Sequence, residues 1–156
     1  MAAKVIEGSK APSFSLPCAG GGTVSLSDFK GQQLVVYFYP KADTSGCTRE
    51  AIDFSRLKGA FAKAGTAVLG VSADPVAKLD KFRTKHGLKV ALGSDETHKM
   101  LDAYGVWAEK SLYGRKYMGI LRNTYLIGPD GKVARVWEKV KVDGHADEVL
   151  AAAKAL

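Results

Sequence analysis

The chain has 156 residues, of which 46% are hydrophobic and 25% charged, and its formal net charge is +7. This length suits one folded domain over residues 1–156 with a sizeable core, and the composition is ordinary for a globular protein. The longest apolar runs are too short to cross a bilayer, and residues 1–7 lack the apolar stretch of a signal peptide. With only two cysteines, we therefore expect a reducing, cytoplasmic location, no structural disulfide and no membrane partner.

The positive charge is compatible with nucleic-acid binding. However, the basic residues are spread along the chain and interleaved with acidic ones, and the densest cluster, residues 109–123, has no accompanying zinc, helix-turn-helix or RNP-like motif. The sequence thus argues against nucleic acid as the main partner and favours a solvated basic face suited to acidic partners. A basic binding module is the weakest hypothesis, which salt-sensitive retention on nucleic acid by a Cys47→Ser variant would favour.

The first half of the chain predicts an extended segment followed by a strand–helix–strand unit. Residues 11–29 read as short extended pieces joined by a glycine turn at 20–22. Residues 34–39 form an apolar run typical of a strand covered on both faces, which Pro40 ends. A second apolar strand is expected at residues 66–71. Between the two strands, apolar residues at steps of three and four predict a helix that ends before the glycine at position 65: Cys47, Ala51, Phe54, Leu57 and Phe61.

The second half of the chain predicts further helices and a hairpin. Asp74 is expected to cap a helix that has Pro75 in its first turn. The elements expected after residue 74 are a helix to 86–87, a short strand at 90–92, a helix over 95–104, a hairpin of strands 123–127 and 132–136, and a closing helix over 146–155. This order predicts an α/β protein of thioredoxin-like fold, with a mixed central sheet flanked by helices and an N-terminal extended or hairpin segment.

Cys47 lies where the predicted helix begins, which leaves two interpretations: a small buried hydrophobe or a reactive thiolate. Its position on the face of Ala51 and Phe54 directs the sulfur towards the sheet. In the first turn of a helix, free backbone N–H groups and the helix dipole favour an anion. Apolar burial opposes ionisation, so a reactive thiolate requires a fixed positive charge nearby.

Arg122 is the better candidate for that charge. Arg49 points away from Cys47 along the helix, whereas Arg122 precedes a predicted strand, and strand ends at one sheet edge converge on helix N-termini. Its forked guanidinium can hold a thiolate and a substrate oxygen together. The Thr44 hydroxyl, three residues before Cys47, is expected within reach of the sulfur, and Thr44 is also suited to cap the helix. Glu50 either orients Arg122 or complements the helix dipole.

The pattern Pro40-x-x-x-Thr44-x-x-Cys47 resembles the active-site motif of peroxiredoxins. The segments "FYPKADTSGCTREAIDF" and "GILRNTYLI" are similar to the bacterioferritin comigratory protein (peroxiredoxin Q) subfamily, and the likeness extends from "APSFSLP" to "GPDGKVARVW". The resemblance implies thiol-based reduction of hydrogen peroxide and organic hydroperoxides. It also implies that Cys47 is the peroxidatic cysteine, that Pro40, Thr44 and Arg122 are its active-site partners, and that neither a metal nor an organic cofactor is needed.

Two positions depart from the subfamily pattern. Ser45 replaces the usual proline after the motif threonine, and Ile52 replaces the usual resolving cysteine. Cys18 belongs to the N-terminal extension, which in this family lies away from the active site, so it is either an incidental thiol, a partner for another chain or, least expected, the resolving cysteine. We expect a one-cysteine cycle in which an external thiol such as thioredoxin, glutaredoxin or glutathione reduces Cys47, in a monomer or weak dimer.

A second hypothesis is a redox sensor or relay, in which Cys47 oxidises only to pass a disulfide to a partner protein. Steady-state peroxide consumption with general thiols distinguishes it from a peroxidase. The absence of a Cys-x-x-Cys motif argues against a disulfide oxidoreductase. The three histidines lack metal-ligand spacing and are expected on the surface near helix ends: His86, His98 and His145.

Overall fold

The computed structural model describes residues 5–156. Residues 1–4, which contribute to the expected domain and to the argument against a signal peptide, lie outside the described part. Within residues 5–156, no helix combines the length and apolar character needed to cross a membrane.

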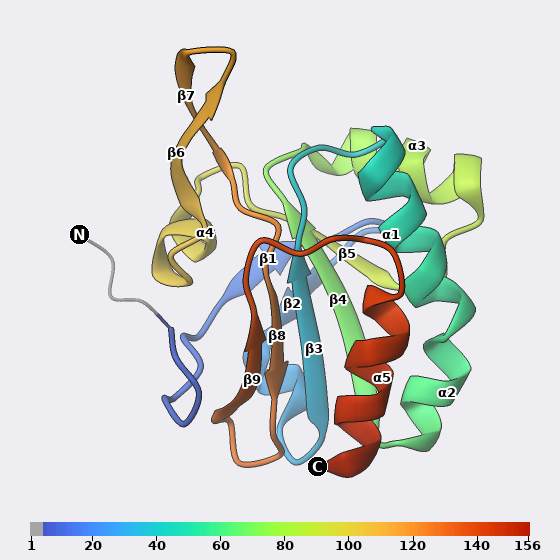
Figure 1. Cartoon of the computed structure of the whole chain (residues 1–156). Helices are drawn as coiled ribbons and strands as arrows, with labels where there is room; N and C mark the ends of the chain where they lie inside the picture. Colours follow the sequence, from blue (N-terminus) through green and yellow to red (C-terminus); the bar gives the residue numbers. More distant parts are fainter. Residues whose placement is uncertain (1–4) are drawn as a thin grey trace.

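A five-stranded mixed sheet forms the centre of the molecule (Figure 1). The central strand β3 pairs in parallel with one neighbour and antiparallel with the other, as Val36 shows by lying opposite both Leu69 and Tyr125. The sequence predicts such a sheet, flanked by helices. In spatial order the strands are β5 (Ala91–Ser94), β4 (Thr66–Ser72), β3 (Gln33–Phe38), β8 (Thr124–Ile127) and β9 (Val133–Trp137).

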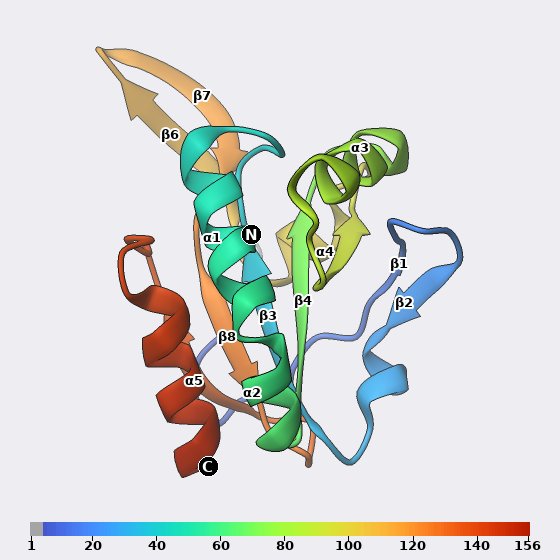
Figure 2. The same cartoon turned by 90° about the vertical axis from the view of Figure 1, so that its right-hand side faces the viewer.

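The two faces of the sheet carry separate cores because successive strand residues point to opposite sides. Val35 and Tyr37 of β3 pack under the four helices of one face, while Val36 and Phe38 face the other core. Figure 2 shows α1 and α2 in line over the first face, with α5 beside them. The helices of that face are α1 (Ser45–Arg56), α2 (Lys58–Lys63), α3 (Val76–His86) and α5 (His145–Ala155).

The opposite face is covered by one short helix and the N-terminal extension. This core includes Leu16 from β1, Val24 from β2 and Leu101 from α4. Strands β1 and β2 form an antiparallel hairpin around the glycine turn, as the sequence predicts. The elements of this layer are β1 (Ser15–Pro17), β2 (Thr23–Ser25), the 3-10 helix η1 (Leu26–Phe29) and α4 (Lys99–Ala103).

A second hairpin, which the sequence analysis does not predict, projects beyond one end of the central sheet (Figures 1 and 2). It consists of β6 (Trp107–Leu112) and β7 (Arg115–Ile120) in antiparallel register. Tyr113 and Gly114 form the turn with φ of 49° and 78°, as a two-residue type I′ turn requires. The residues interpreted above as a solvated basic cluster therefore form a defined structural arm.

Several predicted boundaries are wrong, each for a local reason. The expected long helix starts earlier, at Ser45, and is divided into α1 and α2 at Leu57. The N-cap of α3 is Pro75, not Asp74, because the Asp74 carboxylate instead accepts hydrogen bonds from the Ser72 hydroxyl and the Ala42 N–H.

The region after β4 also differs from the prediction. The strand expected at 90–92 lies at 91–94. The helix expected over 95–104 is only Lys99–Ala103, since His98 precedes it with a left-handed backbone. Asp95 does not begin the helix; its Oδ2 accepts a hydrogen bond from the Leu101 N–H at 2.9 Å.

Candidate active site

Cys47 is the third residue of α1 and is buried, with 1% of its surface exposed. Its side chain belongs to the core that includes Ala51 and Phe54, as the helical spacing predicts. The first hydrogen bond of the helix runs from the Thr48 N–H to the Thr44 carbonyl at 2.8 Å. The N–H groups of residues 45–47 therefore have no acceptor within the helix and are suited to hold negative charge at this end.

Arg122 approaches Cys47 from the segment that precedes β8. The Phe38 N–H donates to the Asn123 carbonyl at 2.8 Å, which holds this segment against the end of β3. From there the Arg122 Nη2 donates to the Cys47 Sγ at 3.3 Å. The predicted contact between the guanidinium and the sulfur is therefore present.

Glu50 holds the other side of the same guanidinium. Its Oε1 accepts a hydrogen bond from the Arg122 Nη1 at 2.7 Å, and its side chain is buried. Burial raises the pKa of the Glu50 carboxyl to about 7, although the neighbouring Arg122 acts to lower it. Of the two roles left open by the sequence, the geometry supports the orientation of Arg122.

Thr44 and Pro40 lie in the loop between β3 and α1. Thr44 is the N-cap residue, but its side chain caps no helix N–H. Instead its Oγ1 donates to the Lys41 carbonyl at 2.8 Å, so the oxygen lone pairs remain available to accept a hydrogen bond. Pro40 is half-buried and follows Tyr39, whose N–H makes the last sheet contact by donating to the Val71 carbonyl.

Two aspartates that the sequence analysis did not assign to the site fix this loop. The Ala42 N–H donates to the Asp74 Oδ2 at 2.8 Å. Asp43 contacts both His86 and Lys85 of α3, and these hydrogen bonds lower the pKa of the Asp43 carboxyl. The loop that carries Thr44 is thus tied to Asp74, just after β4, and to α3.

Gly46 and Lys110 also belong to the surroundings of Cys47 and were missed. A Cβ on Gly46 would lie 3.3 Å from the Arg122 Nη2, so the glycine leaves space for the guanidinium. Lys110 donates from Nζ to the Ile120 carbonyl at 2.8 Å. Burial and the nearby Arg122 lower the pKa of Lys110, while Cys47 acts to raise it. The glycine directly before Cys47 was a sequence signal for close approach; nothing in the sequence indicated Lys110.

The remaining candidates lie away from the sulfur. Arg49 forms an ion pair with Asp143, and both side chains are exposed. Cys18 packs against the core on the opposite face of the sheet from Cys47. Its backbone pairs with Gly93 of the edge strand β5 in an isolated antiparallel β-bridge. Its Sγ donates to the Gly21 carbonyl at 3.3 Å.

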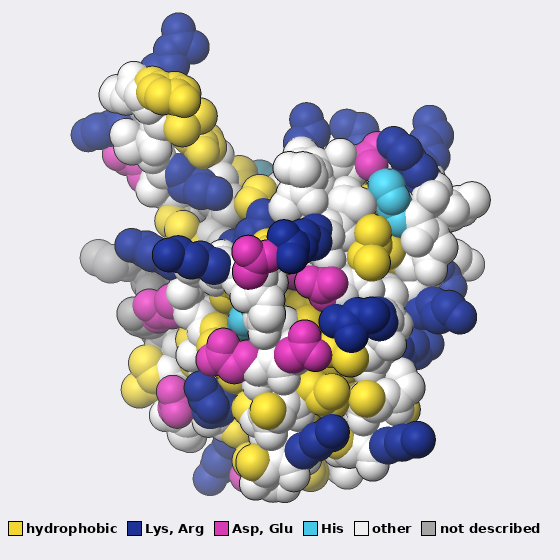
Figure 3. Space-filling view, turned by 45° about the vertical axis from the view of Figure 1, so that its right-hand side comes forward, with side chains coloured by type: hydrophobic (Ala, Val, Ile, Leu, Met, Phe, Trp, Pro, Cys, Tyr) yellow, Lys and Arg dark blue, Asp and Glu magenta, His cyan; other side chains and the backbone are white. Residues whose placement is uncertain are grey.

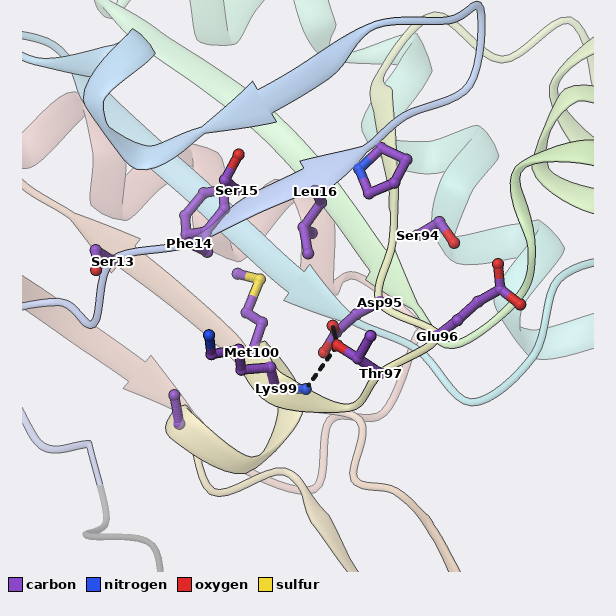
Figure 4. A pocket seen from close by; sticks show the side chains of 12 residues that line it. Ser13, Phe14, Ser15, Leu16, Ser94, Asp95, Glu96, Thr97, Lys99 and Met100 are labelled. Carbon is purple, nitrogen blue, oxygen red and sulfur yellow. Dashed lines mark hydrogen bonds between the residues drawn. The ribbon is translucent and has the colours of Figure 1, made fainter.

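Two open hollows of the molecule lie away from Cys47. One, of about 610 Å³, lies between β1 and α4 and is lined by Leu16, Asp95 and Met100 among others (Figure 4). The other, of about 600 Å³, is lined by Gly20, Asp80 and Arg83. Neither is lined by Thr44, Cys47 or Arg122.

The chemistry of the arrangement follows from its charges. A sulfur at a helix N-terminus beside an arginine is suited to react as a thiolate. The same guanidinium, the helix N–H groups and the Thr44 oxygen can orient a small molecule with two adjacent oxygens. Among residues 5–156, no group of three or more His, Cys, Asp or Glu is arranged to hold a metal ion.

Comparison with known proteins identifies the relatives of the chain. Residues 8–136 match the AhpC/TSA family. The Bacillus subtilis Peroxiredoxin Bcp is 46% identical over 143 residues, which cover 92% of this chain and 91% of that protein. One solved structure comes from work on the alkyl peroxide reduction activity of the Xanthomonas campestris bacterioferritin comigratory protein. It has a TM-score of 0.87 at 46% identity and covers 91% of this chain and 90% of its own. A mutant of Xylella fastidiosa PrxQ has a TM-score of 0.93 at 38% identity, with 98% of both chains covered.

Proposed function

Since the chain belongs to the AhpC/TSA family and is a peroxiredoxin, a thiol-dependent peroxidase of thioredoxin-like fold, we propose that Cys47 is its peroxidatic cysteine. Arg122, Thr44 and Pro40 are proposed as its active-site partners. The observation that carries this assignment is the 3.3 Å contact between Arg122 Nη2 and Cys47 Sγ in the first turn of α1. Glu50 supports it by fixing the guanidinium at 2.7 Å.

In the proposed reaction, the Cys47 thiolate attacks the peroxide oxygen that carries hydrogen. The S–O bond forms as the O–O bond breaks, and the second oxygen leaves with the bonding electrons as hydroxide or alkoxide. That oxygen takes a proton to give water or an alcohol, and the sulfur is oxidised to a sulfenic acid. Arg122 and the first-turn N–H groups stabilise the charge on the departing oxygen, since positioned donors act most strongly in a site closed to water.

Thr44 and Pro40 have positioning roles in this proposal. The Thr44 hydroxyl directs its hydrogen to the Lys41 carbonyl and accepts the hydrogen bond of the peroxide O–H. Pro40 has no N–H and so ends the pairing of β3, after which the chain turns to place Thr44 at the start of α1. An oriented peroxide reacts faster because the entropic cost of alignment is met on binding.

We propose a one-cysteine cycle, because Ile52 stands at the usual resolving position and Cys18 lies on the opposite face of the sheet. An external thiol condenses with the sulfenic acid to give a mixed disulfide and water, and a second thiol releases Cys47. Thioredoxin, glutaredoxin and glutathione are the candidate reductants. All belong to a reducing cytoplasm, the location we propose for the protein, as a monomer or weak dimer.

The test compares peroxide consumption by wild type, Cys18→Ser and Cys47→Ser with each reductant. We expect Cys47→Ser to lose the activity and Cys18→Ser to retain it. Mass spectrometry of wild type treated with peroxide alone should show oxygen added to Cys47. A Cys18–Cys47 disulfide as the main product would contradict the cycle, and full activity of Cys47→Ser would contradict the assignment. A single turnover without recycling by any general thiol would instead identify the sensor or relay.

A further inference from the structure

The β6–β7 hairpin exposes an unusual share of the large hydrophobic side chains. Seven such side chains are exposed among residues 5–156, and four of them lie on this arm. Tyr113 at its turn is 97% exposed. Figure 3 shows hydrophobic and basic side chains together on the projecting arm, which stands clear of the rest of the surface. The four are Leu112, Tyr113, Tyr117 and Met118.

The charge of the arm is basic. It carries Lys110, Arg115 and Lys116 against one acidic residue, Glu109, which lies 3.7 Å from Lys116. Arg115 is exposed and forms no ion pair with any described residue. Tyrosine, methionine and arginine are the residue types enriched at protein–protein contacts, and unpaired cations select an acidic partner.

One face of the arm carries Lys110, whose charge acts on both Arg122 and Cys47. Lys110 lies opposite Tyr117, and Leu112 opposite Arg115; both pairs share one face because alternate residues point the same way. Lys110 contacts the Ile120 carbonyl, two residues before Arg122. We call Lys110, Leu112, Arg115 and Tyr117, with Tyr113 at the turn, the hairpin face.

The base of the arm is fixed to the body of the molecule. The Trp107 ring lies 4.0 Å from the His98 ring, and Ile120 is buried in the core. The Leu121 N–H donates to the Val106 carbonyl at 2.8 Å. The base of the hairpin is therefore anchored next to the segment that carries Arg122.

The length of the arm indicates the size of its partner. A six-residue strand such as β6 spans ~20 Å, so a small thiol or peroxide at Cys47 cannot also contact Tyr113. Since the second cysteine packs on the opposite face of the sheet, the thiol that reduces Cys47 comes from another molecule. A macromolecule with its own thiols satisfies both requirements.

We propose that the hairpin face is the docking surface for an acidic protein that carries two neighbouring thiols and reduces oxidised Cys47. This inference rests on the proposed peroxidase cycle. The first partner thiol forms a disulfide with the Cys47 sulfenic sulfur and releases water. The second partner thiol then attacks the first partner sulfur, and Cys47 leaves as a thiolate. The partner dithiol is thereby oxidised by two electrons to a disulfide.

The test uses the full chain with thioredoxin as the protein dithiol and dithiothreitol as the small one. The variants are Arg115→Glu, which reverses an exposed charge, and Tyr113→Asn, since asparagine tolerates the left-handed backbone of the turn. We expect each to raise the KM for thioredoxin about tenfold, equivalent to 1.4 kcal/mol. Turnover with dithiothreitol and the single-turnover reaction with hydrogen peroxide should stay unchanged. Added salt should raise the KM for thioredoxin more in wild type than in Arg115→Glu, because salt screens the attraction between Arg115 and an acidic partner.

The matched control is Lys58→Glu, which makes the same charge change at an exposed site in the first turn of α2. It should leave the KM for thioredoxin within twofold of wild type. Equal losses with thioredoxin and dithiothreitol, or no loss with thioredoxin, would overturn the proposal. So would variants that change only binding to anionic vesicles or self-association. If wild type fails to consume peroxide even with dithiothreitol, the proposed function itself is wrong.

Discussion

Arg122 contacts both the reactive sulfur and a buried carboxylate, so a single guanidinium links two acceptors at the site. Its Nη1 lies 2.7 Å from Glu50 and its Nη2 lies 3.3 Å from Cys47. A lysine at this position would lose the fork that contacts both groups at once. The position of the guanidinium beside Cys47 therefore depends on the residues that surround Arg122 as well as on the residues that react.

Gly46 leaves space for the guanidinium, and it provides a test at the level of one methyl group. In Gly46→Ala, the new Cβ would approach the Arg122 Nη2 to 3.3 Å and displace it from Cys47. We expect the rate of Cys47 oxidation by hydrogen peroxide, measured by stopped-flow fluorescence, to fall about tenfold. Thermal unfolding should show equal or higher stability, because alanine favours a helix over glycine by up to ~1 kcal/mol.

The control for that variant is Gly59→Ala in α2, where no atom lies within 4 Å of the added Cβ. It should likewise show equal or higher stability, with no change in rate. If Gly46→Ala reacts as fast as Gly59→Ala, the close approach of Gly46 to Arg122 has no functional importance.

Glu50 should make the stability of the protein depend on pH. Its pKa is raised from 4.5 to about 7, so between these values the folded state holds more protons than the unfolded state, and the free energy of unfolding falls as pH rises. At 1.4 kcal/mol per pKa unit the loss is on the order of 3 kcal/mol. Urea unfolding across pH 4.5–7.5 should show the stability of wild type falling by this amount relative to that of Glu50→Gln, because the groups that titrate in both proteins cancel in the difference. Parallel curves would show that folding does not raise the pKa of Glu50.

At the level of elements, sequence pattern predicted best the parts whose periodicity is set by burial. Strand β3 and the stripe of α1 that carries Cys47 were found because each must place its apolar residues on a packed face. The β6–β7 hairpin was missed because its alternation is obscured by exposed hydrophobic and basic residues on both faces. The predicted extent of α4 was also wrong, because Asp95 accepts a hydrogen bond from the Leu101 N–H six residues on, a contact that helix propensity does not predict.

Helix α5 begins with a histidine whose burial the sequence pattern did not predict. His145 was expected on the surface, but it is buried, and its Nε2 lies 2.9 Å from the Thr124 Oγ1 of β8. Its ring also meets Phe54 of α1 edge-on, with centroids 6.0 Å apart. The first residue of α5 therefore joins that helix to both the sheet and α1.

This contact should make the docking of α5 sensitive to acid. Burial lowers the pKa of His145 from 6.5 to about 4, so its contribution to stability is present above pH 6.5 and is lost as pH falls towards 4. We expect wild type to lose stability relative to His145→Gln over this interval in urea unfolding. The Glu50→Gln variant should still lose stability as pH falls, because its His145 is intact. Glu50 itself titrates with the opposite effect on stability. If the difference in free energy of unfolding between wild type and His145→Gln does not change with pH, the histidine does not have this role.

Across the whole molecule, the sheet separates the two cysteines as well as the two cores. Sequence spacing predicted the contact of Arg122 with Cys47, because strand order and helix starts follow from topology. It did not give the position of Lys110 or the loop contacts of Asp43 and Asp74, which depend on how distant segments meet. The catalytic roles of Cys47 and its partners remain predictions for the variants described above.

Because β3 belongs to both cores, we expect the two faces to unfold together as one domain. Trp137 packs against the core under α1 and Trp107 against the opposite core, so Trp107→Phe and Trp137→Phe each leave a fluorescent reporter of one face. Into each we would introduce Leu79→Ala or Leu101→Ala, which remove fully buried side chains from opposite cores and should each cost about 2–5 kcal/mol. A cooperative unit gives both reporters the same shift in urea midpoint, each measured from its own tryptophan parent. If Leu101→Ala lowers the midpoint seen by Trp107 and leaves that seen by Trp137 unchanged, the chain contains two units that unfold independently.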